Sequence, residues 1–322
     1  MTGYFLLPKQ MTELTLEQFE NYDVTGMGHD DLQQFIYAFH DAHPDETSWN
    51  LNKWDVSHIT DMSCLFGNIK IEELIIDKWD TRNVTDMSAM FWKCRPLRLL
   101  KLNFNTKNVT NTCYMFCFCE SIEELDLSSF NTENVENMMG MFWECKSLQR
   151  LKQNFNTKNV TNMSCMFMSC EQIESLNLPN FTSESLLTVV DMFGYCESLK
   201  ELHLPNFSMN SVADAAAMFN NCEKLMELDL PFSLENISRT RGMFNGCMKL
   251  KNIELNNFGC SPVDMLWMFC NCDELSELCI SSLKSGTIDI SSLRKLKQMS
   301  LRNEIIDSLN VDESWDAKMY EP

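Results

Sequence analysis

A unit of 25 or 26 residues recurs along the 322-residue chain and limits, more than any other feature, what the chain can fold into. Its clearest mark is a Met-Phe dipeptide with a cysteine four positions after the methionine. The methionines are Met90, Met115, Met141, Met166, Met192, Met218, Met243 and Met268, and Leu65-Phe66 is an earlier variant. A period of this length is typical of solenoids, in which each repeat is one small structural unit.

An aromatic residue also recurs, usually eleven positions before the methionine. The aromatic residues are Trp54, Trp79, Phe104, Phe130, Phe155, Phe181, Phe207, Phe232 and Phe258. Together the two series predict nine leucine-rich repeats over residues 50–282.

Each unit combines two local periods. In the unit of Met166, the residues Val160, Met163, Phe167 and Cys170 fall at helical spacing after Asn and Thr residues suited to an N-cap. This pattern predicts a helix of about three turns at most. The units that drift from the consensus are expected to keep their place in the stack, with uneven helical segments.

A short strand is predicted after each cysteine. Its mark is the pattern Leu-x-x-Leu-x-Leu, as at Leu199, Leu202 and Leu204, where the last two leucines share one face of a strand. Neither element buries its apolar side alone, so the repeats must stack. We therefore predict an α/β leucine-rich-repeat solenoid with one short strand and one short helix per repeat and a parallel sheet on one face.

Atypical sequence at both ends is expected to cover the open ends of the core. Residues 1–49 are interpreted as an N-terminal helical cap, with an amphipathic helix around residues 30–39. Residues 283–322 are interpreted as a degenerate tenth repeat, a C-terminal cap and an acidic tail, because Leu293, Leu296, Met299 and Leu301 continue the leucine spacing.

Fifteen cysteines raise the question of disulfides or zinc. Eight of them occupy the repeat position, where a small and weakly polar side chain suits a tight core, so we interpret them as reduced buried thiols. The pairs Cys117-x-Cys119 and Cys270-x-Cys272 lack the spacing of a common zinc site, and His40 and His43 lack that of a helical zinc-protease motif. We expect no metal site.

Catalysis is not predicted either. No glycine-rich nucleotide loop and no Gly-x-Ser-x-Gly motif is present, and the chain has ten glycines. No nucleophile, base and oxyanion donor can be combined from the sequence. We expect neither an enzyme nor a cofactor.

The unit from Trp79 to Cys94 closely resembles the repeat of BspA-like leucine-rich-repeat proteins, including the Mycoplasma-type lipoprotein repeat of unknown function. The pattern returns from Phe130 to Cys145 and from Phe155 to Cys170. The resemblance implies a leucine-rich-repeat fold and surface-exposed binding or adhesion without catalysis. Similar repeats occur in protists and large DNA viruses, where an intracellular role or a place in the virus particle fits.

Net charge and hydropathy limit the kinds of partner and the cellular locations that we expect. The formal charge of −20 repels nucleic acid and anionic membranes. No apolar run is long enough to span a bilayer, and the first ten residues lack the pattern of a signal peptide. We expect a cytoplasmic location or one within a virus particle. Oligomeric state and glycosylation of the seven Asn-x-Ser/Thr sequons stay open.

The predicted binding surface is the open face of the sheet. Its candidate partner-binding residues are Glu124, Asp126, Arg150, Lys152, Glu201, His203, Glu227, Asp229 and Glu254. Charges alternate in sign between neighbouring strands from Lys101 to Lys152, which favours cross-strand pairs. From Glu201 onward the face is mainly acidic and suits a basic protein, although a solvated face with no partner is the alternative.

The sequence therefore favours a non-catalytic scaffold for protein–protein interaction, in a virus particle or an intracellular assembly. One alternative is an F-box-like substrate adaptor of a ubiquitin ligase. Its basis is the series Leu7-Pro8, Met11, Leu14, Phe19 and Tyr22-Asp23. The other alternative is a secreted or cell-surface adhesion protein, as the family resemblance implies.

Overall fold

A computed structural model describes residues 8–182, 184–207, 209–228, 234–255 and 263–281, together with residues 293, 295 and 298–302. The chain divides into two compact units, Met1–Phe155 and Asn156–Pro322, and each is described by itself.

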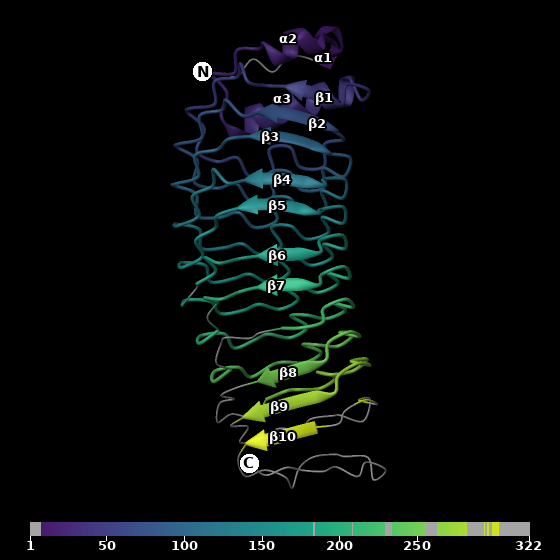
Figure 1. Cartoon of the computed structure of the whole chain (residues 1–322). Coiled ribbons are helices and arrows are strands. Elements are labelled where there is room, and N and C mark those ends of the chain that lie inside the picture. Colours follow the sequence, from purple (N-terminus) through teal and green to yellow (C-terminus); the bar gives the residue numbers. More distant parts are fainter. Residues whose placement is uncertain are drawn as a thin grey trace. The chain divides into compact units, whose positions relative to one another are not determined.

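The first unit opens with the helices α1 (Pro8–Glu13), α2 (Leu16–Glu20) and α3 (His29–Ala42) (Figure 1). A capping box at Thr15 begins α2. The helix predicted around residues 30–39 lies within α3, whose buried face includes Phe39. The ring of Phe19 stacks on Phe39 at 3.8 Å and meets Trp49 at 5.3 Å, so the helices pack against the first strand.

Five strands follow in the first unit: β1 (Ser48–Asn50), β2 (Glu73–Ile76), β3 (Leu99–Leu102), β4 (Glu124–Leu127) and β5 (Arg150–Gln153). They pair in parallel in the orders β1-β2-β3 and β4-β5 (Figure 1). Leu125 and Leu127 of β4 are buried while Glu124 and Asp126 are exposed. The predicted solenoid with parallel strands is confirmed.

The second unit has the strands β6 (Ser175–Asn177), β7 (Glu201–His203), β8 (Asn252–Leu255), β9 (Glu277–Ser281) and β10 (Gln298–Arg302). They form the parallel sheets β6-β7 and β8-β9-β10. The strand predicted around Glu227 is not formed by the described residues there, and Asp229 lies outside them.

The predicted helix of each repeat is wrong. The Met-Phe segments are runs of turns, and the backbone of each segment forms hydrogen bonds with a neighbouring repeat. We call these segments the turn ladder. It comprises residues 61–69, 86–94, 111–119 and 137–145 in the first unit and 162–170, 188–196, 214–222, 239–247 and 264–272 in the second.

Backbone geometry explains why no helix forms. Every segment of the turn ladder has left-handed residues one position before and three positions after its methionine (or Leu65). These are Cys64, Asn68, Ala89, Lys93, Tyr114, Phe118, Gly140, Glu144, Cys165, Ser169, Asp191, Tyr195, Ala217, Asn221, Gly242, Gly246, Trp267 and Asn271. A positive φ at every fourth residue interrupts a right-handed helix and costs about 1–2 kcal/mol for a residue with a side chain.

Hydrogen bonds between repeats offset that cost. Alternate residues of one segment donate their N–H groups to carbonyls of the next, as Met87 does to Asn111 at 3.0 Å and Phe91 to Met115 at 2.9 Å. The intervening N–H groups close turns within the segment, as Trp92 does to Ala89 at 2.9 Å. The segment thereby satisfies its buried backbone without a helix.

The core contains columns of identical side chains. In the first unit the rings of Phe66, Phe91, Phe116 and Phe142 stack at 5.4–5.7 Å, and in the second unit Phe167 and its successors stack at 5.5–5.8 Å. These phenylalanines are fully buried. Each of these repeats therefore contributes one phenylalanine ring to the stack, which lies in the apolar interior of its unit.

Beside the phenylalanines runs a column of buried thiols. Cys94 donates its S–H group to the carbonyl of Phe66 at 3.0 Å, and Cys119 donates to Phe91 at 3.2 Å. The bond recurs at Cys145, Cys196, Cys222, Cys247 and Cys272. The cysteines among the described residues are free thiols. Each of these seven cysteines is thus a small core residue whose polar hydrogen has an acceptor.

Candidate protein-interaction surface

The structure brings together the four candidate residues of the first unit. Glu124 and Asp126 lie on β4 opposite Arg150 and Lys152 on β5, in the register expected for cross-strand pairs. Arg150 forms an ion pair with Glu124, and Lys152 Nζ lies 3.3 Å from Asp126 Oδ2. These exposed pairs contribute little to stability, about 0.2–1 kcal/mol each. Their charges, however, compensate one another across the strands.

The candidate residues of the second unit form a less compensated surface. Glu201 and His203 are exposed on β7, Glu254 is exposed on β8, and Glu227 is exposed outside a strand. Among the described residues, neither Glu201 nor Glu227 has a basic side chain within ion-pair distance. These two carboxylates are therefore exposed without a basic side chain beside them in the described part of the chain.

No group of three or more metal-binding side chains comes together among the described residues. Burial raises the pKa of the Cys119 thiol well above its usual range, and that of Cys272 to about 12, so both stay protonated. His43 uses its Nε2 atom in a 2.9 Å hydrogen bond with the carbonyl of Met11. Cys119, Cys272 and His43 therefore have structural roles in the described part of the chain, where they do not form a set of zinc ligands.

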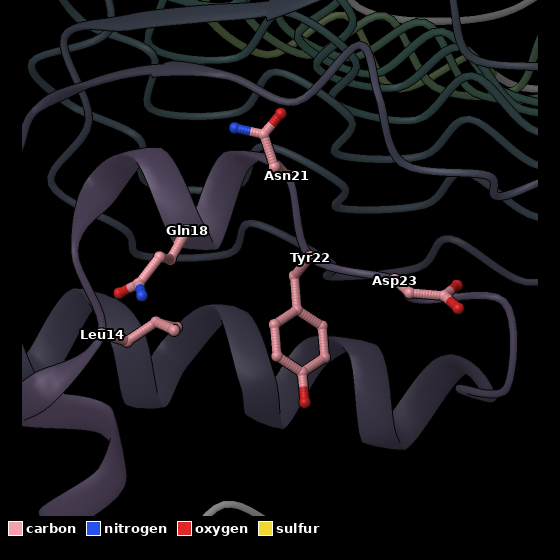
Figure 2. Close-up of a pocket in the computed structure, with 5 residues that line it drawn as sticks. All are labelled: Leu14, Gln18, Asn21, Tyr22 and Asp23. Carbon is pink, nitrogen blue, oxygen red and sulfur yellow. The ribbon is translucent and has the colours of Figure 1, made fainter.

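A hollow of about 510 Å³ lies at the N-terminal helices and is lined by Leu14, Gln18, Asn21, Tyr22 and Asp23 (Figure 2). Tyr22 points toward α3, where its ring lies 4.6 Å from that of Phe35. The hydroxyl of Thr25 donates a hydrogen bond to Asp23 and holds the pKa of that carboxyl below its usual range. Asp23 is the one carboxylate among the five lining residues, and its hydrogen bond with Thr25 is the interaction shown for it there.

The adaptor hypothesis draws on residues of the same helices. Met11 and Phe19 are buried. They belong to the core of this segment, whereas Leu14 and Tyr22 line the hollow.

Among the described carboxylates, Asp191 stands out because burial raises its pKa. It lies at a left-handed position of the turn ladder, half-buried, and its backbone N–H donates to Ala216 at 3.0 Å. Burial raises the pKa of Asp191 from 3.8 to about 6. Burial, together with the charge of Asp191, also raises the pKa of the Cys165 thiol to about 11. A protonated thiol beside a carboxylate is not an activated nucleophile.

Replacing Asp191 by Asn should stabilise the protein in a pH-dependent way. The folded state binds the carboxyl proton more tightly, so the destabilisation by Asp191 is absent below about pH 4 and complete above its folded pKa of about 6. After allowance for its partial exposure, we expect Asp191→Asn to raise the free energy of unfolding by about 1 kcal/mol at pH 7.5.

Urea unfolding at pH 7.5 and pH 4 measures this difference. The exposed Asp273→Asn controls for the loss of one negative charge. An Asp191→Asn gain of the same size at both pH values would show that the pKa of Asp191 plays no part.

The partly exposed aromatic side chains of the turn ladder are not among the binding residues predicted from the sequence. Trp92, Tyr114, Phe118 and Trp143 lie on three successive repeats of the first unit. Aligning the repeats on the Met-Phe dipeptide shows that most other repeats have smaller or polar residues at these positions, and that Met168, Tyr195 and Trp267 are the large exceptions. The wrong helix prediction hid that signal, since it placed these positions on a helix surface.

Within the described residues, the structure has no helix that is both long enough and apolar enough to cross a membrane. The strand ladders, the repeat length and the buried leucines define a leucine-rich-repeat solenoid.

The chain belongs to the family described as Mycoplasma protein of unknown function, DUF285, whose profile matches residues 33–126, 64–180 and 115–230, together more than half of the chain. The profile of the BspA type leucine rich repeat region (6 copies) matches residues 187–310. These matches confirm the predicted BspA-like resemblance. A search of the curated proteins gives no match.

Three solved structures with similar folds are each 16% identical to this chain. The TLR13–ssRNA13 complex matches with a TM-score of 0.29 over 92% of this chain, which spans about half (52%) of the TLR13 chain. A leucine rich cell surface protein from Faecalibacterium prausnitzii matches with a TM-score of 0.30 over 76% of this chain and 84% of that one. An internalin (inlF) from Listeria monocytogenes matches with a TM-score of 0.31 over 89% and 83%.

Proposed function

We propose that the chain is a non-catalytic interaction scaffold that binds a basic protein through the sheet face of its second unit. The observation that carries the proposal is the contrast in charge pairing between strands. Glu124 and Asp126 are compensated by β5, whereas Glu201 and Glu227 are exposed and form no such pair with any described residue. Uncompensated charge at an exposed surface steers and selects an oppositely charged partner.

A virus particle or an intracellular assembly is the setting that the sequence favours, and the BspA-type repeat supports the interaction role. The proposal expects stable association with a partner and no turnover of a substrate.

The test is affinity purification from native material, followed by calorimetry with the recovered partner. The double variant Glu201→Lys/Glu227→Lys should weaken binding by about tenfold or more, with a reduced dependence on salt. The matched control Glu197→Lys/Glu235→Lys changes the net charge equally at exposed positions outside the strands. If both double variants lose the same affinity, the loss is due to the change in net charge, and the sheet face is not the binding site.

A further inference from the structure

The turn ladder of the first unit has a cluster of aromatic side chains on its surface. The ring of Trp143 lies 6.3 Å from that of Tyr114 and 5.4 Å from that of Phe118. Trp92 belongs to the preceding repeat, and all four side chains are partly exposed. We call these four residues the aromatic patch.

The fold does not need large rings at these positions. Tyr114 and Phe118 have φ angles of 57° and 61°, where bulky side chains are strained. Equivalent positions in other repeats include Gly140, Asn221 and Gly242, which tolerate this geometry more easily, and only Tyr195 and Trp267 among them also carry aromatic rings. The rings of Tyr114 and Phe118 are not fully buried, so core packing does not account for their size.

A glycine in the next repeat makes room for one of the rings. A Cβ atom at Gly140 would lie 2.6 Å from Cδ1 of Tyr114, closer than van der Waals contact permits. Gly140 therefore allows the Tyr114 ring to lie across the neighbouring repeat. The patch is a surface assembled from matched residues of adjacent repeats.

Positive charge lies directly on this apolar surface. Lys93 Nζ is 4.1 Å from the ring centroid of Trp92 and 6.0 Å from that of Phe118, within cation–π range. Among the described residues, no carboxylate forms an ion pair with Lys93. Arg95 also lies over Phe118, at 5.2 Å, but pairs with Glu120. Lys93 thus leaves one uncompensated positive charge among the rings.

We propose that the aromatic patch binds an acidic peptide segment of another protein. Apolar side chains of the segment pack on the rings, and a carboxylate of the segment pairs with Lys93. Aromatic residues are typical of the residues that contribute most to binding. A second copy of this chain fits less well, since two chains of charge −20 repel each other, whereas a short segment meets mainly the local charge of Lys93.

The patch lies on the turn ladder and not on the sheet, and its ligand is acidic, so the inference does not depend on the basic partner proposed above.

The experiment is fluorescence titration of the full chain with the tryptophan-free peptide Asp-Phe-Asp-Leu-Asp-Phe-Asp, followed through the emission of the chain's tryptophans and the anisotropy of a dye on the peptide. Lys93→Glu should weaken binding by about tenfold or more, and the exposed Lys107→Glu in the same unit by less than about twofold. Gly140→Ala should also weaken binding, because the added methyl group displaces the Tyr114 ring.

Circular dichroism shows whether each variant is folded. If Gly140→Ala does not fold, Lys93→Glu still tests the proposal, because it changes only a side chain at the surface. The proposal is overturned by absent binding of the acidic peptide, by tighter binding of the same peptide with lysine in place of aspartate, or by equal losses in the two lysine variants. Sedimentation showing a dimer that Lys93→Glu dissociates would instead assign the patch to a second copy.

Discussion

Phe116→Ala is expected to lower the free energy of unfolding by about 3–5 kcal/mol. The Phe116 ring is fully buried and stacks between Phe91 at 5.4 Å and Phe142 at 5.7 Å. Its removal leaves a cavity in a column whose backbone is held by hydrogen bonds on both sides, so the repeats cannot close over it. Urea unfolding followed by circular dichroism measures the loss, and hydrogen exchange shows whether it is centred on residues 111–119.

The matched control is Phe118→Ala, the same truncation two residues further along the turn ladder. Because Phe118 is partly exposed and outside the phenylalanine stack, its loss should cost less than about 1 kcal/mol. Similar losses in the two variants would mean that the stack itself is not what stabilises the unit.

Cysteine alkylation should separate two classes of thiol by a large factor. Burial raises the pKa of Cys94 from 9.0 to about 12, which lowers its thiolate fraction about a thousandfold at neutral pH. Cys64 is exposed, and its pKa is raised less. We expect iodoacetamide at pH 8 to modify Cys64 in the folded protein and to modify the buried repeat cysteines on the order of 10³-fold more slowly.

Mass spectrometry of the peptides gives each rate, and the difference should vanish in guanidinium chloride. Cys64→Ser should remove the fastest reaction and leave the slow ones unchanged. Rapid alkylation of Cys94 in the folded state would contradict its placement in the core and its hydrogen bond to Phe66.

Several features of the fold were predictable from local patterns. The alternation at Leu125 and Leu127 placed β4 correctly, since a strand alternates its side chains between two faces. The repeat length placed Glu124 beside Arg150 and Asp126 beside Lys152, because residues one repeat apart are neighbours in a stacked sheet. The same reasoning failed at Glu227, where the expected strand is not formed by the described residues.

The helix prediction failed for a reason that the sequence cannot reveal. A run of turns with a left-handed residue at every fourth position buries residues three and four apart, as an α-helix does. Met163, Phe167 and Cys170 are buried in either structure. The aromatic patch was missed as a consequence, because its members become comparable only once the turn positions of successive repeats are aligned.

By itself, the sequence determined the repeat length, the residues of the core and the parallel stacking, because an apolar pattern repeated every 25 or 26 residues can be buried only by its neighbours. Only the tertiary structure decided between helix and turns. The carbonyl groups that accept from Met87 and Phe91 belong to the next repeat, and they become available only when the repeats are stacked. Tertiary hydrogen bonds then outweigh a local preference that the sequence expresses one repeat at a time.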